Sequence, residues 1–340
     1  MKRKTGLFVC MAALTAVLCG CAALGAEGGA PALPQPQSTL HIAPKGSPSR
    51  AAADLVPDRL ERDEKGVPLL SVYDVKQEKL IRESVEEYLP AVLAGEMAGD
   101  WPLEALKAQA ILARTFVLQF VSEKKSRYEG ADISTDIEEA QAYDAAGVNE
   151  RIKSAVEETR GLVLNAGGEL PYAWFHAHSG GLTARAKEGL DYEKDEPAYT
   201  QCVKGMENSE APKEAASWEA AFTMDEVIAA CRDAGAKVEK IESISIGQRG
   251  ESGRAMTLLV SGKEVSAPAF RIAIGSTKMR SCLLESLRVE DGQVKMRGRG
   301  YGHGVGMSQW GAYAMAKEGK TAEEIVTHYF AGVMLDSAWD

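Results

Sequence analysis

The spacing of apolar residues along the chain predicts helices in its first half and strands in its second half. Residues 83–94 and 103–120 carry apolar side chains three and four positions apart, as helices with one buried face do. Asp100 is the expected N-cap of the second of these helices, with Pro102 in its first turn. Further helices are expected at 151–158 and at 224–234, the latter opened by Thr223.

Shorter runs of alternating apolar and polar residues predict strands. The first is expected over 67–73, where ordered structure should begin, and a buried one over 170–176. Glycines separate the later runs, which lie at 162–164, 241–246, 255–260 and 294–296. Helices first, then segregated strands, then a last helix predict an α+β fold, with helices around an antiparallel sheet and a Gly-rich loop leading to a C-terminal helix.

The N-terminus has the pattern of an export signal. Three basic residues (2–4) precede an apolar run over 7–18, which is shorter than the roughly 20 residues of a membrane span. The next residues, 18–21, resemble a lipoprotein signal, in which Cys21 would be lipidated; ordinary cleavage near 23–25 is the alternative. Either route places the mature protein outside the cytoplasm, in the cell envelope or anchored to the membrane.

These patterns divide the chain into three regions. Residues 1–26 form the signal peptide or lipoprotein signal, 27–66 a Pro- and Ala-rich linker that cannot bury a core, and 67–340 the folded domain. The net charge of −10 argues against a nucleic-acid partner, which favours a basic face. Beyond the signal the chain has three widely spaced cysteines, which leave one disulfide open without indicating its pairing: Cys202, Cys231 and Cys282.

The segment GRGYGHGVGMSQWGA, residues 298–312, holds six glycines in fifteen residues. Glycine adopts backbone conformations that other residues avoid and lets the chain approach a ligand or a neighbour closely. Tyr301, His303 and Gln309 lie among these glycines and supply stacking and hydrogen-bonding groups. The segment is therefore a candidate substrate-binding loop, with a structural turn against the sheet as the alternative.

Glu96 is the only charged residue between Tyr88 and Gly99. A carboxyl group among apolar neighbours keeps its proton to higher pH, because desolvation disfavours the anion. A general acid for glycosidic cleavage needs that property near neutral pH. The alternative is a surface glutamate at a helix end, which is the commoner fate of a lone Glu.

Three blocks of the sequence together resemble the SpoIID/LytB family, the stage II sporulation protein D group. The first covers 85–115 and includes the Gly-Glu-Met of residues 95–97 and the segment KAQAILART. The second is FHAHSGGLT at 175–183, and the third begins with the Gly-rich segment and runs to about residue 333. The resemblance implies that 67–340 is a catalytic domain and that Glu96, in the family's Glu-Met motif, is its catalytic residue.

The implied activity is that of a peptidoglycan lytic transglycosylase acting on peptide-free glycan strands between N-acetylmuramic acid and N-acetylglucosamine. No second acidic residue has surroundings like those of Glu96. One carboxyl group suffices for this reaction, because the C6 hydroxyl of the muramic residue serves as the nucleophile and closes a 1,6-anhydro ring. The implied partners are glycan strands, a cell-wall amidase, and the membrane through an N-terminal lipid anchor.

Two cations and the second block supply further candidate substrate-binding residues. Lys107 and Arg114 match family positions and lie two helical turns apart on one face, so they could form a cationic rail for lactyl carboxylates. The alternatives are a Lys107–Glu104 pair and a buried ion pair for Arg114. In the second block the cleft wall is expected to consist of His176 and His178 with Ser179, Gly180 and Gly181.

His176 and His178 alternate along an expected strand, so both rings could reach one ion. A zinc site is therefore an alternative to the cleft wall, with Cys202 as the third ligand, although no cofactor is expected. Two other functions stay open: a non-catalytic enhancer or binding partner of an amidase, like the LytB branch, and a metal-dependent wall hydrolase.

Overall fold

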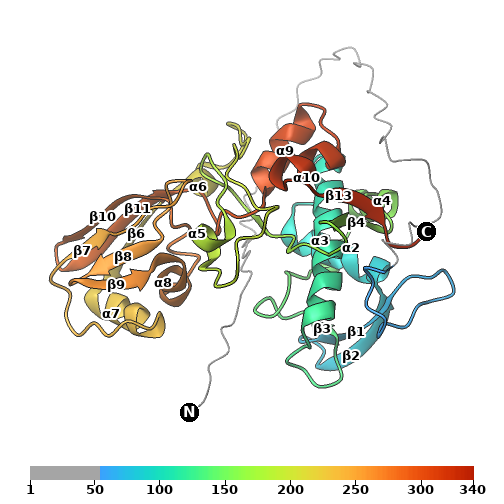
Figure 1. The fold of residues 1–340 in the computed structure, drawn as a ribbon, viewed down its shortest axis with the longest axis horizontal. Coiled ribbons are helices and arrows are strands. Elements are labelled where there is room, and N and C mark those ends of the chain that lie inside the picture. The colour runs from blue at the N-terminus through green and yellow to red at the C-terminus, as the bar shows by residue number, and fades with distance from the viewer. Residues whose placement is uncertain (1–53) are drawn as a thin grey trace, which may run out of the picture.

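The computed structural model describes residues 54–340, and the chain forms two lobes (Figure 1). A helical lobe is built on the long helix α3, and a β lobe, residues 217–299, contains the strands β6 to β11. Each lobe has its own cluster of buried apolar side chains. The region that the sequence pattern assigns to one folded domain thus contains two large cores and a smaller cluster around Trp174 and Val305, and the chain returns to the helical lobe after residue 306.

The elements carry the labels of Figure 1. The helices are α2 (Val85–Glu96), α3 (Leu103–Glu123), the 3-10 helix η1 (Ala145–Gly147), α4 (Glu150–Glu158), α5 (Ala186–Leu190), α6 (Lys213–Ala216), α7 (Met224–Asp233), α8 (Ala267–Ile274), α9 (Gln309–Lys317) and α10 (Ala322–Tyr329). The strands are β1 (Leu69–Asp74), β2 (Lys79–Ser84), β3 (Ile133–Ser134), β4 (Leu162–Asn165), β5 (Phe175–His176), β6 (Ser217–Thr223), β7 (Ile244–Ile246), β8 (Thr257–Val260), β9 (Lys263–Ser266), β10 (Leu284–Glu290), β11 (Gln293–Arg299), β12 (Met307–Ser308) and β13 (Met334–Ser337). The α+β prediction is confirmed, although several small sheets replace the single expected one.

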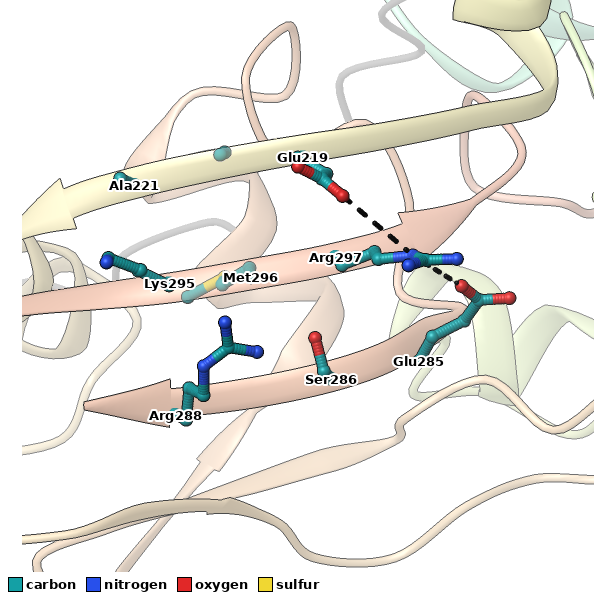
Figure 2. Close-up of a pocket in the computed structure, with 9 residues that line it drawn as sticks. Glu219, Ala221, Glu285, Ser286, Arg288, Lys295, Met296 and Arg297 are labelled. Carbon is teal, nitrogen blue, oxygen red and sulfur yellow. Dashed lines mark hydrogen bonds and ion pairs between the residues drawn. The ribbon is translucent and has the colours of Figure 1, made fainter. Parts of the chain in front are cut away.

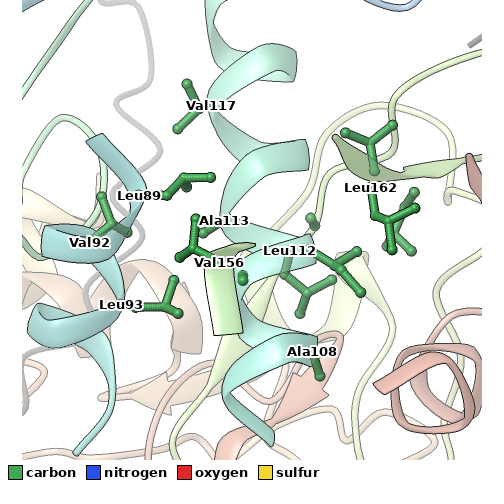
Figure 3. Close-up of a cluster of buried hydrophobic side chains, with 14 of the residues drawn as sticks. Leu89, Val92, Leu93, Ala108, Leu112, Ala113, Val117, Val156 and Leu162 are labelled. Atoms are coloured by element: carbon green, nitrogen blue, oxygen red, sulfur yellow. The ribbon is translucent and has the colours of Figure 1, made fainter. Parts of the chain in front are cut away.

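Helix α3 forms the centre of the helical lobe. Its sequence is rich in Ala and Leu, which favour helix, and its buried residues include positions on every side. Leu89 and Leu93 of α2, Leu112 of α3 and Val156 of α4 pack together in this core (Figure 3). Because other elements enclose α3, polar side chains on it are buried too. Lys107 and Arg114, two predicted site residues, are among them.

Helix α2 ends at the predicted catalytic carboxyl. Ser84 caps its N-terminus in a capping box with Glu87, so the helix begins and ends two residues later than the pattern predicts. The shift makes Glu96 the last residue of the helix. The predicted cap of α3 is wrong: Pro102 occupies the N-cap position, and Asp100 lies outside the helix.

The β lobe contains two antiparallel sheets, with strand orders β10-β11-β6 and β7-β8-β9. Helix α7 begins where predicted, with Thr223 and Glu226 forming its capping box. The strands predicted at 255–260 and 294–296 correspond to β8 and β11. Helix α8 was missed, although Ser266 caps it and Pro268 lies in its first turn.

A short parallel pairing connects the second and third family blocks. Strand β5 pairs with β12, with Phe175 opposite Met307 and His176 opposite Ser308. The predicted strand over 170–176 is thus reduced to two residues. His178 and Tyr301 form a further backbone bridge, so the two blocks run side by side between the lobes.

The predicted linker boundary at residue 66 is too late. Leu55, Val56 and Leu60 are buried in the core of the helical lobe, so packing begins by residue 55. Cys21 and the predicted signal lie outside the described residues. Within 54–340 no helix has the length and apolar character needed to span a bilayer. The three cysteines of this region, whose pairing the sequence left open, are free thiols.

Candidate active site around Glu96

The carboxyl group of Glu96 is buried and only half satisfied. The residue is 3% exposed, and the Ala142 N–H donates a hydrogen bond of 2.8 Å to Oε1. Oε2 is buried and has no hydrogen-bond partner among the described residues. The preceding Gly95 allows this approach, since a Cβ there would lie 2.7 Å from the carbonyl carbon of Ala142. One oxygen of this carboxyl group is thus held by the fold and the other is not.

Burial raises the pKa of Glu96 to about 8, and the Ala142 hydrogen bond opposes the shift without cancelling it. No other charged side chain contributes to this pKa. The carboxyl group therefore keeps its proton at neutral pH, which is the state that a general acid requires.

The first and third family blocks meet at Glu96. The Gln309 side chain donates from Nε2 to the backbone carbonyl of Glu96 at 3.2 Å and to Oε1 of Gln109 at 3.4 Å. Gln309 comes from the third block, while Glu96 and Gln109 come from the first. Gln109 was not singled out in the sequence, although it lies in the KAQA segment of the first block. Gln309 is therefore a positioning residue in this geometry, and its predicted contact with substrate stays a prediction.

A second perturbed carboxyl group lies at the opposite end of α2. Burial raises the pKa of Glu83 to about 7, with smaller contributions from Glu87 and Asp74. Glu83 lies just before α2 and Glu96 is its twelfth and last residue, which places them about 18 Å apart along the helix. Paired carboxyl groups in glycosidases lie roughly 5–9.5 Å apart. Glu96 and Glu83 are thus poorly placed to act as such a pair.

His176 and His303 are neutral, buried side chains. Nδ1 of His176 lies 3.1 Å from the carbonyl of Val305, and Nδ1 of His303 accepts from the Val305 N–H at 3.0 Å. Burial is the main cause that lowers both pKa values, that of His303 to about 3. Both rings therefore brace the Gly-rich loop through its backbone. Contact of His176, His303 or Tyr301 with substrate stays a prediction.

Ser179 is held by Glu207, a residue that the sequence did not reveal. The carboxylate accepts hydrogen bonds from the backbone and hydroxyl of Ser179, at 2.5 and 3.0 Å, and from the Ser308 hydroxyl at 2.6 Å. Burial would raise the pKa of Glu207, but His178 and these donors lower it overall. Glu207 thus joins the second block to the third. Gly180 adopts φ +76°, and a Cβ there would crowd Leu283 at 2.8 Å.

The histidine pair has no third ligand. Among residues 54–340, no three His, Cys, Asp or Glu side chains gather closely enough to hold a metal ion. Nδ1 of His178 accepts from the Gly180 N–H at 2.9 Å, and Nδ1 of His176 is taken by Val305. The residues present therefore do not fit the zinc alternative, and we derive no chemistry through a metal.

The predicted cationic rail is wrong. Lys107 is 4% exposed, and its Nζ lies 2.8 Å from Glu104 and 2.5 Å from Glu158. Arg114 is fully buried and pairs with both oxygens of Glu86, at 3.0 and 2.8 Å. The enclosed position of α3 is the physical reason, because neither cation faces solvent. These ion pairs are the alternatives that the sequence left open, and they give both cations a structural role.

Replacement of Arg114 by methionine is expected to destabilise the protein by about 3–5 kcal/mol, since it leaves the Glu86 carboxylate nearly buried without its cation. Urea unfolding measures the loss. Arg151→Ala is the matched control: Arg151 is exposed on α4, and its loss should change stability by less than about 0.5 kcal/mol. Unchanged stability with activity lost only on carboxylated glycan would restore the rail.

A hollow of ≈ 540 Å³ lies on the β lobe, over the sheet formed by β6, β11 and β10 (Figure 2). Figure 2 shows Arg297 between Glu219 and Glu285, at 4.0 and 3.0 Å. Arg288 and Lys295 also pair with acidic residues, both with Glu290. Because its cations are paired on an open surface, this hollow has no buried, unpaired carboxyl group like that of Glu96.

Two protein-family models match regions of this chain. The family model for stage II sporulation protein matches residues 73–165, which include Glu96 and Gln109. A model for a domain of unknown function, DUF8618, matches residues 187–306, which include the β lobe. One part of the chain thus matches the stage II sporulation protein model, and the next part matches a domain of unknown function.

Full-length relatives extend the match. Stage II sporulation protein D of Bacillus subtilis is 30% identical over 283 residues, which cover 79% of each chain. An uncharacterized protein of Brachyspira hyodysenteriae is 28% identical over 74% of this chain and 66% of its own length. The amidase enhancer of Bacillus subtilis is 26% identical over 73% of this chain but only 40% of its own length. On the identity and coverage shared with stage II sporulation protein D, this chain belongs to the SpoIID family.

Proposed function

We propose that this protein is a peptidoglycan lytic transglycosylase, which cleaves peptide-free glycan strands between N-acetylmuramic acid and N-acetylglucosamine outside the cytoplasm. The observation that carries the proposal is the buried Glu96 carboxyl group, with a pKa near 8 and one free oxygen. A group in this state donates a proton at neutral pH and recovers one after the bond has broken.

In the first step the Glu96 carboxyl group gives its proton to the glycosidic oxygen, and the bond from that oxygen to the muramic C1 breaks. The N-acetyl carbonyl of the sugar supports the positive charge that develops at C1. The C6 hydroxyl oxygen then attacks C1, and its proton passes to the Glu96 carboxylate. The sugar leaves with a 1,6-anhydro ring, and Glu96 is protonated again.

A single carboxyl group is consistent with the surroundings of Glu96. Burial raises its pKa, and Glu83, the other carboxyl group with a strongly raised pKa among the described residues, lies at the far end of α2. Oε2 is buried, so access of the glycan to it requires movement of the surrounding chain. Ala142 holds the other oxygen, Oε1, through its N–H.

The second candidate function is that of an amidase-stimulating protein. It is favoured by the similarity to a Bacillus subtilis protein described as an amidase enhancer. Under that proposal Glu96 would have no chemical role, and the charged segment 187–216 is a place where a partner could bind. The perturbed pKa of Glu96 favours the enzyme.

Incubation of the purified protein with peptide-free glycan strands should release soluble fragments in the absence of any amidase. The rate should fall as the pH rises through about 8, because Glu96 loses the proton that it must donate. Chromatography of the fragments across pH 5–10 measures both effects.

A parallel reaction adds a cell-wall amidase and intact peptidoglycan. If the protein only stimulates an amidase, peptide release will increase while peptide-free strands stay uncut at every pH. That result would replace the proposed activity with the second one.

A further inference from the structure

Three aromatic side chains form a cluster where the loop after α2 meets α9. The ring centroids of Trp101 and Trp310 are 4.6 Å apart, and Tyr313 lies 5.2 Å from each of them. Trp101 belongs to the loop between α2 and α3, whereas the other two lie in α9. Aromatic clusters are common in protein cores, so the cluster by itself indicates no ligand.

Its position connects it to the catalytic carboxyl group. Trp101 follows Glu96 by five residues, and Trp310 follows Gln309, whose amide binds the Glu96 carbonyl. Trp101 is 8% exposed, while Trp310 and Tyr313 are only partly buried. The cluster thus has a buried end beneath and an accessible end on α9. A cluster that served the core alone would bury all three rings.

A cation, Lys317, lies next to the aromatic cluster on the accessible side of α9. The Lys317 ammonium lies 5.5 Å from the centre of the Tyr313 ring, and the Tyr313 hydroxyl donates to Glu210 at 2.9 Å. Lys317 is exposed and forms none of the ion pairs found among the described residues. Seven residues separate Trp310 from Lys317, which corresponds to about 10 Å along the helix. An aromatic surface thus ends in a cation with no acidic partner.

We infer that Trp101, Trp310 and Tyr313 form a stacking surface for a sugar ring of the glycan, and that Lys317 binds a carboxylate on the same strand. The C–H faces of pyranose rings pack on aromatic rings, and an ammonium group attracts the lactyl carboxylate of a peptide-free muramic residue. This inference rests on the proposed function for its ligand. It also assigns the binding of carboxylates to Lys317 in place of Lys107 and Arg114, which are buried.

The binding test uses the full protein carrying Glu96→Gln, so that the glycan stays intact. Calorimetry with peptide-free glycan oligosaccharides gives the dissociation constant. Trp310→Leu in this background should weaken binding by about ten-fold, and Trp310→Phe, which keeps an aromatic face, should weaken it far less. Tyr313→Leu is a second variant at the accessible end, where the risk to folding is smaller.

The charge test compares these oligosaccharides with the same molecules after amidation of their carboxylates. Lys317→Gln should weaken binding of the charged form by about three- to ten-fold and leave binding of the amidated form unchanged. Lys320→Gln is the matched control, since Lys320 is exposed just beyond α9 and pairs with Glu324 at 2.8 Å. It should alter neither affinity.

Equal affinities for the folded Trp310→Leu, Tyr313→Leu and parent proteins would overturn the stacking surface, even if the wild type cleaves glycan. Equal losses for Lys317→Gln on the charged and amidated ligands would overturn the assignment of the carboxylate. If binding depends on these residues but wild type cuts no strand, the stacking surface stands and the proposed activity fails. The two proposals are thus separable.

Discussion

Replacing Glu96 with glutamine is expected to lower kcat/KM for glycan cleavage by about 10²–10⁴-fold or more, because the amide keeps the shape of the side chain but cannot donate the proton. Initial rates of fragment release from peptide-free strands measure the effect. Full retention of cleavage would remove Glu96 from the mechanism.

The same substitution should stabilise the folded protein near neutral pH. The pKa of Glu96 is about 8 in the folded state and near the ordinary glutamate value of 4.5 in the unfolded chain. The wild-type carboxyl group therefore contributes its full stability below about pH 4.5 and loses it as the pH rises toward 8. Glu96→Gln should raise the melting temperature at pH 7 relative to wild type, with a smaller difference at pH 4. An inactive variant that is also more stable cannot owe its inactivity to misfolding.

Glu83→Gln is the matched control for this substitution. Glu83 has a raised pKa and an unpaired buried oxygen like those of Glu96, but it lies at the other end of α2. It should retain glycan cleavage and gain stability at neutral pH. Loss of cleavage in Glu83→Gln would indicate a two-carboxyl mechanism and contradict the role of a single acid.

The sequence predicts the apolar surroundings and the burial of the Glu96 carboxyl group well, because they are local. Glu96 is the only charged residue in an apolar stretch of the sequence, and its side chain is buried in the folded protein. The helices that begin at Val85 and Met224 were placed to within two residues, since their caps lie next to them in the chain. Features of this kind can be predicted because the residues that determine them are neighbours in the sequence.

The rest of the site depends on contacts between distant segments. Lys107 and Arg114 do share a helix, but their burial follows from the elements that enclose α3, which spacing along one helix does not reveal. Glu207 lies in a charged irregular segment and gains its role only when Ser179 and Ser308 reach it. The aromatic cluster likewise forms only when α9 packs beside the loop after α2.

The measurement that tests the central claim most directly is mass spectrometry of the fragments formed from peptide-free glycan in water enriched in oxygen-18. An authentic muramidase that hydrolyses its substrate gives the reference, with labelled oxygen at C1 of each new end. For this protein we expect new muramic ends in the 1,6-anhydro form with no solvent oxygen, and none from Glu96→Gln. Labelled, reducing muramic ends from the wild type would show that water is the nucleophile and would contradict the account.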